Sequence, residues 1–134
     1  MTMYRQYDGY MEGHGLELAE FLNRGRLVNG LGGKDNGTVF NGMGCLAAQL
    51  VAHFKKEAGQ FYLHSTDLNQ DAGQEYEYHV FRDKVVVHCV YGNERVVFDG
   101  TWAEFYKVCK GKEVRYQDLH LNKQSNKMLV SLAQ

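Results

Sequence analysis

The sequence predicts an α+β fold, in which an antiparallel β-meander of four to five strands is packed on one face by two N-terminal helices. Two patterns support this fold class. Apolar residues recur at helical spacing within 16–22 and 46–58, and they alternate with the two-residue period of strands between 75 and 99. Helices that precede a meander are typical of α+β domains with an antiparallel sheet. A short helix after the meander and a C-terminal helix complete the expected fold.

The composition indicates one domain covering residues 1–134. Hydrophobic residues make up 44% of the chain and charged residues 23%, which is the balance of a folded globular protein. The net charge is −1, from 15 basic and 16 acidic residues, so no basic surface is available to neutralise many phosphates. General nucleic-acid binding is therefore disfavoured, whereas a single nucleotide or small anion needs only one local pocket.

The three cysteines, Cys45, Cys89 and Cys109, are far apart in sequence and odd in number, which argues against a disulfide framework. Free thiols suit a reducing cytosol. The first residues lack the apolar run of a signal peptide, and no stretch approaches the length of a membrane-spanning helix. We therefore expect a cytoplasmic protein without a membrane segment.

Two helices are expected in the first half of the chain. One follows Gly13-His14-Gly15 and ends at Gly25, because glycine is common just after a helix. The other, Cys45–Gly59, has the strongest helical pattern of the sequence. Between them we expect a short extended segment, Arg26–Asn29, and then a glycine-rich loop, Asn29–Gly44.

Strands are expected in the second half. A first strand at Gln60–Ser65 is followed by a polar loop at Thr66–Gln74, and three strands of the meander follow it: Glu75–Arg82, Val85–Tyr91 and Glu94–Asp99.

The segments after the meander begin with a capping box, Thr101-Trp-Ala-Glu104, in which each end residue satisfies a backbone donor of the other. A short helix should run from it to Lys110 and stop at Gly111. Glu113–Tyr116 reads as a further strand, and Ser125–Ala133 reads as the C-terminal helix.

Turn geometry predicts which strand residues share a face. With two-residue loops at Asp83-Lys84 and Gly92-Asn93, His79 pairs with His88 and His88 with Val97. The face that should receive the helices then carries Tyr76, Tyr78, Val80, Val85, Val87, Cys89, Tyr91, Val96 and Phe98. The opposite face carries Glu75, Glu77, His79, Phe81, Val86, His88, Val90, Arg95, Val97 and Asp99.

The paired imidazoles of His79 and His88, with Glu77 nearby, are the side-chain types that hold a divalent metal. No HxH, HxxxH or cysteine-rich motif accompanies them, so we expect no metal site. The alternative is that both are half-exposed polar residues on the open face of the sheet.

Cys45 is a candidate nucleophile because it follows Gly-Met-Gly and opens a helix, where the helix dipole lowers a thiol pKa. A cysteine on a helix followed by a histidine on a strand is also the order of papain-like Cys-His hydrolases. His79 and His88 are expected on the face away from the helices, which leaves His64 as the partner. The alternative is that Cys45 is a small packed hydrophobe.

The glycine-rich loops are the preferred ligand site. DGYMEGHG and NGMG each lead into a helix N-terminus, whose free backbone N–H groups attract phosphate or carboxylate. Neither loop has the spacing of a P-loop or a dinucleotide fingerprint, and both also read as plain turns. The candidate ligand-binding residues are Arg5, Tyr7, Asp8, Gly9, Tyr10, Gly13, His14, Asn41, Gly42 and Gly44.

Three stretches carry a family resemblance: YRQYDGYMEGHGLELAEFL (Tyr4–Leu22), NGMGCLAAQLVAHFK (Asn41–Lys55) and EYEYHV (Glu75–Val80). They resemble a set of small, largely uncharacterised proteins of phages and prophages, in which a proline commonly follows DGY. Met11 stands at that position here, which puts the turn in doubt. The resemblance implies a phage or mobile-element origin, with a host cytoplasm as the location, and no established activity. Small phage proteins often act on host defence by binding a partner or sequestering a signalling nucleotide.

These observations predict a binding protein rather than an enzyme. It needs no cofactor and holds a small anionic ligand, such as a host-defence nucleotide, in the glycine-rich loops of a homo-oligomer. A protein–protein inhibitor of a host factor and a Cys-His hydrolase that uses Cys45 are the alternatives.

Overall fold

The computed structural model describes residues 1–28, 38–64, 73–90, 92–119 and 128–132, with the backbone alone for 113–119. The elements in chain order are β1 (Thr2–Arg5), a turn of π-helix η1 (Met11–Gly15), α1 (Leu16–Arg24), β2 (Gly25–Val28), β3 (Thr38–Asn41), α2 (Gly42–Phe54), β4 (Phe61–His64), β5 (Tyr76–Val80), β6 (Val85–Cys89), β7 (Arg95–Gly100), α3 (Trp102–Leu119) and β8 (Met128–Leu132).

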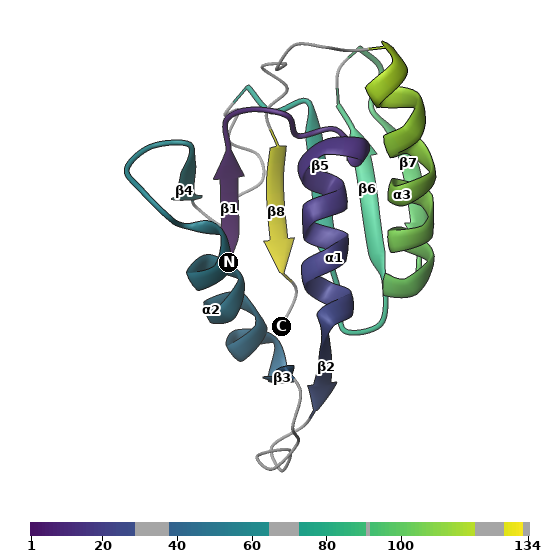
Figure 1. Cartoon of the computed structure of the whole chain (residues 1–134). Helices are drawn as coiled ribbons and strands as arrows, with labels where there is room; N and C mark the ends of the chain where they lie inside the picture. The colour runs from purple at the N-terminus through teal and green to yellow at the C-terminus, as the bar shows by residue number, and fades with distance from the viewer. Residues whose placement is uncertain (29–37, 65–72, 91, 120–127, 133–134) are drawn as a thin grey trace.

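Six strands form one mixed sheet in the order β4-β1-β8-β5-β6-β7 (Figure 1). Strands β5 and β8 run parallel, and the other neighbours are antiparallel. Strands β2 and β3 form a separate parallel pair. The α+β class is confirmed. The predicted antiparallel meander of four to five strands is wrong, because only β5, β6 and β7 form a meander and β8 adds to β5 in parallel.

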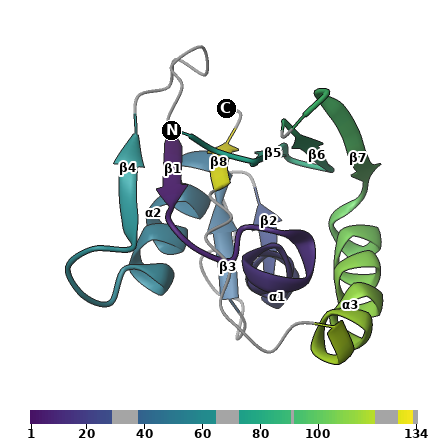
Figure 2. The same ribbon diagram turned by 90° about the horizontal axis from the view of Figure 1, so that it is seen from above.

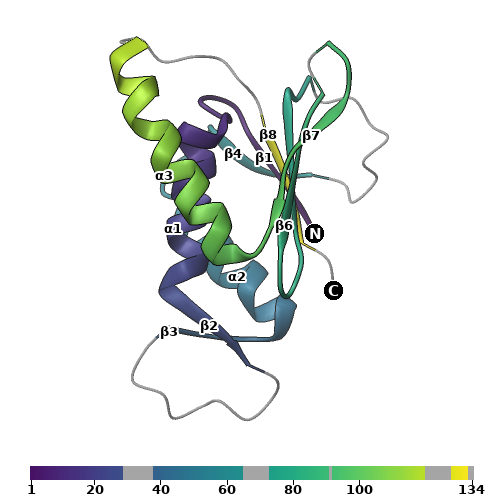
Figure 3. The same ribbon diagram turned by 90° about the vertical axis from the view of Figure 1, so that its right-hand side faces the viewer.

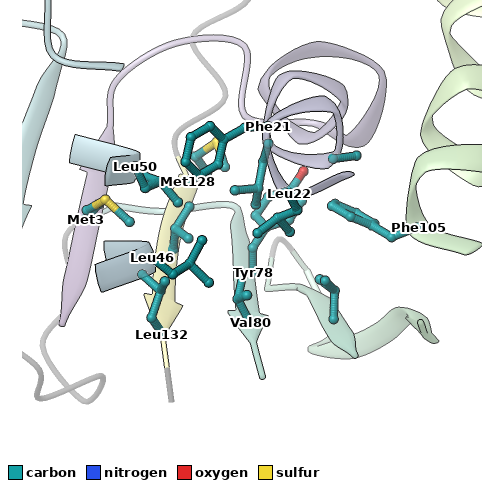
Figure 4. Close-up of a cluster of buried hydrophobic side chains, with 14 of the residues drawn as sticks. Met3, Phe21, Leu22, Leu46, Leu50, Tyr78, Val80, Phe105, Met128 and Leu132 are labelled. Atoms are coloured by element: carbon teal, nitrogen blue, oxygen red, sulfur yellow. The ribbon is translucent and has the colours of Figure 1, made fainter. Parts of the chain in front are cut away.

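Helices α1, α2 and α3 all lie on one side of the sheet (Figures 2 and 3). The core fills the space between the helices and the sheet, and Tyr78, Phe105 and Met3 are among its largest fully buried side chains (Figure 4). Phe40 is another. Burial of each such side chain contributes roughly 1.5–3 kcal/mol. The apolar face of the meander therefore packs against the helices and forms one side of the core, as the alternation of apolar residues along its strands predicts.

The first two helices are confirmed with altered bounds. α1 starts after Gly15 and ends before Gly25, as predicted, and Gly25 is required because an added Cβ would lie 2.3 Å from the Phe40 ring. α2 starts earlier than predicted, at Gly42, and ends earlier, at Phe54. The chain is extended from Lys55 onward, and the Lys55 ammonium donates to the backbone oxygens of Gly59 and Phe61.

The predicted C-terminal helix is wrong, since Met128–Leu132 forms strand β8 in the middle of the sheet. β8 pairs with β1 on one side and β5 on the other, and four of its five residues are buried. A strand covered on both faces shows a continuous apolar run instead of alternation, so its periodicity resembles that of a buried helix. The sequence pattern does not predict strand β1.

The predicted end of the short helix at Gly111 and the predicted strand Glu113–Tyr116 are also wrong. α3 continues through both to Leu119. A Cβ at Gly111 would meet nothing within 4 Å, so no packing constraint accounts for the glycine, which the helix tolerates at a cost of about 1 kcal/mol. The capping box is confirmed: the Glu104 backbone N–H donates to Thr101 Oγ1, and the Thr101 N–H donates to Glu104 Oε1, both at 3.1 Å.

The β5–β6 loop is longer than predicted. Val80 pairs with Val85, so four residues form the loop and not two, and His79 lies opposite Val86. The predicted pairing of His79 with His88 is wrong by two residues, which leaves the side chains of β5 and β6 on their predicted faces. Gly92, the expected turn glycine, has a positive φ of 75°.

The remaining predicted segments agree in part. β2 and β4 match the expected strands at Arg26–Asn29 and Gln60–Ser65, apart from one or two residues at their ends. β3 and the start of α2 occupy the second part of the predicted glycine-rich loop. Residues 29–37, 65–72, 91 and 125–127, on which other predictions fall, lie outside the described residues. No described helix is both long and apolar enough to cross a membrane.

Candidate functional site

A recess of about 160 Å³ opens between η1, the β5-β6-β7 part of the sheet and α3. Its floor and walls combine apolar atoms with charges of both signs. The lining residues are Met11, Glu12, Tyr76, Cys89, Arg95, Val97 and Lys112.

The turn η1 brings Met11 and Glu12 to the recess. The carbonyl of Tyr10 accepts hydrogen bonds from the backbone N–H groups of Gly13 and Gly15, and Tyr78 Oη donates to the carbonyl of Gly9 at 2.6 Å. These bonds tie the turn to the buried centre of the sheet. Met11 is thereby buried against the core, and Glu12 stands beside it at the rim.

A β-bulge brings Arg95 to the same recess. Val87 pairs with Phe98 but His88 pairs with Val96, so Val97 is an extra residue on β7. The extra residue reverses the faces to which the side chains of Arg95 and Val96 point. Arg95 therefore lies opposite Cys89 on the helix-covered side of the sheet. The prediction that placed Arg95 on the outer face and Val96 on the inner face is wrong for this reason. Val96, opposite His88, is 55% exposed.

Helix α3 supplies Lys112. The capping box starts the helix, Phe105 and Cys109 anchor it in the core, and the turn after Gly111 extends it over the recess. The pKa of the Cys109 thiol is raised to about 12, first by burial and then by the charge of Glu12, while Lys112 acts to lower it. Glu12 and Lys112 therefore both lie close enough to Cys109 to change its pKa, in opposite directions. This agrees with their position in the lining of the same recess.

The Tyr76 phenol remains protonated at neutral pH. Burial is the largest cause that raises its pKa to about 12, followed by Cys89 and Glu12. A protonated phenol can donate a hydrogen bond to an anion. Arg95 is held at the mouth of the recess, where its Nη1 donates to the carbonyl of Asn93 at 3.1 Å. The site therefore offers two cations, one carboxylate and one phenol around an apolar floor.

Two of the predicted ligand-binding residues, Arg5 and His14, lie together beside Glu17 and outside the recess. The Glu17 carboxylate lies 2.7 Å from His14 Nδ1 and 3.4 Å from Arg5 Nη1, and the Arg5 guanidinium lies over the Phe54 ring. Burial alone would raise the pKa of Glu17, but His14 and Arg5 outweigh it and lower this pKa. The cavity beneath them is about 10 Å³, roughly the space of one water. These charges therefore interact chiefly with one another.

The other predicted residues of the first loop serve packing. Gly9 and Tyr10 are buried, and Tyr10 Oη donates to Asp8 Oδ1 at 3.1 Å. Asp8 has a positive φ of 57°, and a Cβ on Gly13 would lie 2.5 Å from the Asp8 carbonyl oxygen. Tyr7 is half-buried. The DGY and GHG strings are thus explained by a tight turn under the core.

The second predicted loop lies at the other end of the helical layer. Val28, the last residue of β2, pairs with Asn41, just before α2, so the start of α2 lies beside the end of β2 (Figure 1). Gly42 has a φ of 80°, and a Cβ on Gly44 would meet nothing within 4 Å. The structure does not bring Asn41, Gly42 and Gly44 together with the first loop.

Cys45 and His64 are not brought together either. Cys45 lies on α2, on the core side of the sheet, where its Sγ accepts from Gln49 Nε2 at 3.2 Å. His64 alternates with Phe61 and Leu63 along β4 and shares the face of Tyr62 and Tyr4, which is opposite to buried Phe61. The sheet therefore separates the thiol from the imidazole.

The two strand histidines are diagonal neighbours on the outer face, with ring centroids 5.0 Å apart. His79 Nε2 lies 3.5 Å from Glu77 Oε1, and His88 Nδ1 lies 3.7 Å from Glu94 Oε1. Within the described ranges, no group of three or more His, Cys, Asp or Glu side chains has the geometry to hold a metal ion.

Sequence reasoning missed the recess because its charged residues depend on two irregularities. Lys112 was expected beyond the end of a helix, and Arg95 was expected on the outer face. Glu12 lay inside a loop that was interpreted for its glycines. The one usable signal was the capping box, which locates α3 but not its length.

Comparisons of the chain with protein-family models, with curated proteins and with solved structures found no match.

Proposed function

We propose that the protein is a non-enzymatic binding protein for a small anionic ligand, and that the ligand occupies the recess between η1, β7 and α3. The single observation that supports this proposal is the presence of Arg95 and Lys112 in the lining of a recess of about 160 Å³. Among the lining side chains, two are cations and one is a carboxylate. A partly desolvated anion gains more from such charges than it would in bulk water.

The size of the recess limits the ligand. A cavity of about 150 Å³ holds one benzene molecule. The recess can therefore enclose a carboxylate or phosphate with a few carbon atoms, or one group of a larger molecule. A phosphate of a signalling nucleotide is one such group, and sequestration of that nucleotide would be a phage-type accessory role.

The experiment is a thermal-shift titration with inorganic phosphate, short-chain carboxylates and mononucleotides. We expect at least one of these anions to raise the unfolding temperature, because a ligand that binds only the folded state stabilises it. Lys112→Gln and Arg95→Gln should each weaken binding by roughly tenfold or more, as hydrogen bonds to charged groups contribute about 1.5–3 kcal/mol.

Matched controls separate this recess from other basic residues. Lys107→Gln removes an exposed charge from the same helix, and Arg5→Gln tests the cluster at Glu17. The proposal requires that Lys107→Gln leave binding unchanged. It is contradicted if no anion shifts the transition, or if Arg5→Gln abolishes a shift that Lys112→Gln preserves.

A further inference from the structure

We infer that the ligand of the recess is zwitterionic, a small α-amino acid that presents its carboxylate to Arg95 and Lys112 and its ammonium to Glu12. This inference rests on the proposed function and specifies its ligand class. It follows from two residues of opposite charge, Glu12 and Lys112, that line the same recess without forming an ion pair with each other.

Glu12 and Lys112 are the residues that carry the argument. Both are half-buried and both line the recess. No ion pair joins either of them to another residue that the structure describes. Elsewhere in the same protein, the half-buried charge of Arg5 does form a pair, with the exposed carboxylate of Glu17. Partial burial of an unpaired charge is costly, and a ligand group of opposite sign removes that cost.

The presence of Glu12 decides between a plain anion and a zwitterion. A ligand with only an anionic group would place its charge near the Glu12 carboxylate as well as near Lys112. Like charges at short range repel, so part of the attraction from Lys112 would be lost. An ammonium on the same ligand converts that repulsion into attraction, because the recess then meets each ligand charge with its opposite.

The rest of the lining suits a short carbon skeleton. Met11 and Cys89 are buried and form apolar surface, and Val97 adds a branched aliphatic side chain from the bulge. Tyr76 completes the wall with an aromatic ring and a protonated hydroxyl. A small aliphatic amino acid has this combination of two charged groups and an apolar side chain within the size of the recess.

The test uses three probes that share the isobutyl group: valine, 3-methylbutanoate, which lacks the ammonium, and isobutylamine, which lacks the carboxylate. Each is titrated into the ¹⁵N-labelled protein and followed by NMR. We expect valine to bind on the order of tenfold more tightly than either analogue. The shifted amide signals should include those of Glu12, Tyr76, Arg95 and Lys112.

A charge-neutral substitution gives the second arm. In Glu12→Gln we expect valine to lose about tenfold in affinity, while 3-methylbutanoate binds as well as before or better. A residue that only supported the fold would weaken both probes together. Glu57→Gln removes an exposed carboxylate and serves as the control. The comparison of probes on the unmodified protein stands even if Glu12→Gln does not fold.

The outcomes distinguish the two levels of the proposal. Equal affinities of valine and 3-methylbutanoate would overturn the zwitterion and leave anion binding intact. Binding of inorganic phosphate without binding of valine would do the same. If neither these probes nor the anions of the thermal-shift titration bind, both the inference and the proposed function are overturned.

Discussion

Gly15 is the residue whose lack of a side chain matters most for the centre of the fold. A Cβ at this position would lie 2.8 Å from Tyr78 Oη, the hydroxyl that donates to the carbonyl of Gly9. Tyr78 is fully buried, so its ring cannot move into solvent. Gly44 on α2 is the contrasting case, because a Cβ there would meet nothing within 4 Å.

Gly15→Ala should therefore destabilise the protein by about 1–3 kcal/mol, the usual cost of overpacking a core. Gly44→Ala should be neutral or stabilise it by about 0.5–1 kcal/mol, because alanine loses less backbone entropy than glycine in a helix. Urea denaturation with circular dichroism measures both. Equal effects of the two substitutions would show that the contact with Tyr78 is not what makes Gly15 necessary.

At this scale the sequence locates the glycines but not all of their contacts. It predicts that the backbone of Gly9, Gly13 and Gly15 approaches a ligand, and the structure shows that each lies against the protein's own atoms. Local sequence shows that a tight approach is needed, but it cannot show which partner approaches. The sequence also does not predict that the charged residues of the recess lie close together, because these residues are distant from one another in the chain.

The β5–β6 hairpin carries two diagonally adjacent imidazoles, His79 and His88, and the burial of His79 couples the stability of the fold to pH. Burial is the largest cause that lowers the pKa of His79, and His88 lowers it further, while Glu77 opposes both. The folded protein therefore takes up this proton at a lower pH than the unfolded chain does. The stabilisation is fully present above the ordinary pKa of histidine, about 6.5, and is lost as pH falls through the lowered value.

We expect His79→Gln to lose less stability than the unmodified protein between pH 7 and pH 5. In His88→Gln the neighbouring positive charge is absent but burial remains, so the loss should be intermediate. The measurement is the free energy of unfolding in urea at a series of pH values. Parallel curves for all three proteins would mean that His79 does not contribute to the pH dependence.

The elements show where periodicity suffices and where it fails. α1, α2 and the faces of β5 and β6 follow from spacing within ten or so residues, and they were predicted. The bulge at Val97 was not, because Arg95-Val96-Val97-Phe98 fits a regular strand as well as a bulged one. α3 continues past Gly111 because nothing in the described part of the structure requires a glycine, and hence a helix end, at that position. The sequence alone does not distinguish such a glycine from one that ends a helix.

The whole sheet depends on contacts between distant segments. β8 (Met128–Leu132) lies between β1 (Thr2–Arg5) and β5 (Tyr76–Val80), so it pairs with residues more than 120 positions away on one side. Such pairing has no local signal, and this is why the sequence predicted a helix there. Without β8 the sheet would divide into β4-β1 and β5-β6-β7, and an isolated two-stranded piece is marginally stable at best.

Val130→Asp tests this dependence. Val130 is 5% exposed, faces the core and pairs with Met3 on β1 and Tyr78 on β5. An unpaired carboxylate at that position would cost several kcal/mol or force the strand out of the sheet, against a total stability of about 5–15 kcal/mol for a typical domain. We therefore expect Val130→Asp to abolish the cooperative urea transition.

Ser131→Asp is the matched control, because Ser131 is the next residue of β8, points to the opposite face and lies opposite His79. It introduces the same carboxylate into the same strand without burying it in the core, and we expect the cooperative transition to survive. Circular dichroism during urea unfolding measures both variants. A cooperative transition of Val130→Asp at the unmodified midpoint would mean that β8 is dispensable, and the sheet would then be held by its two parts separately. Loss of the transition in both variants would instead indicate that β8 tolerates a carboxylate on neither face. Burial of Val130 in the core would then not explain the effect of Val130→Asp.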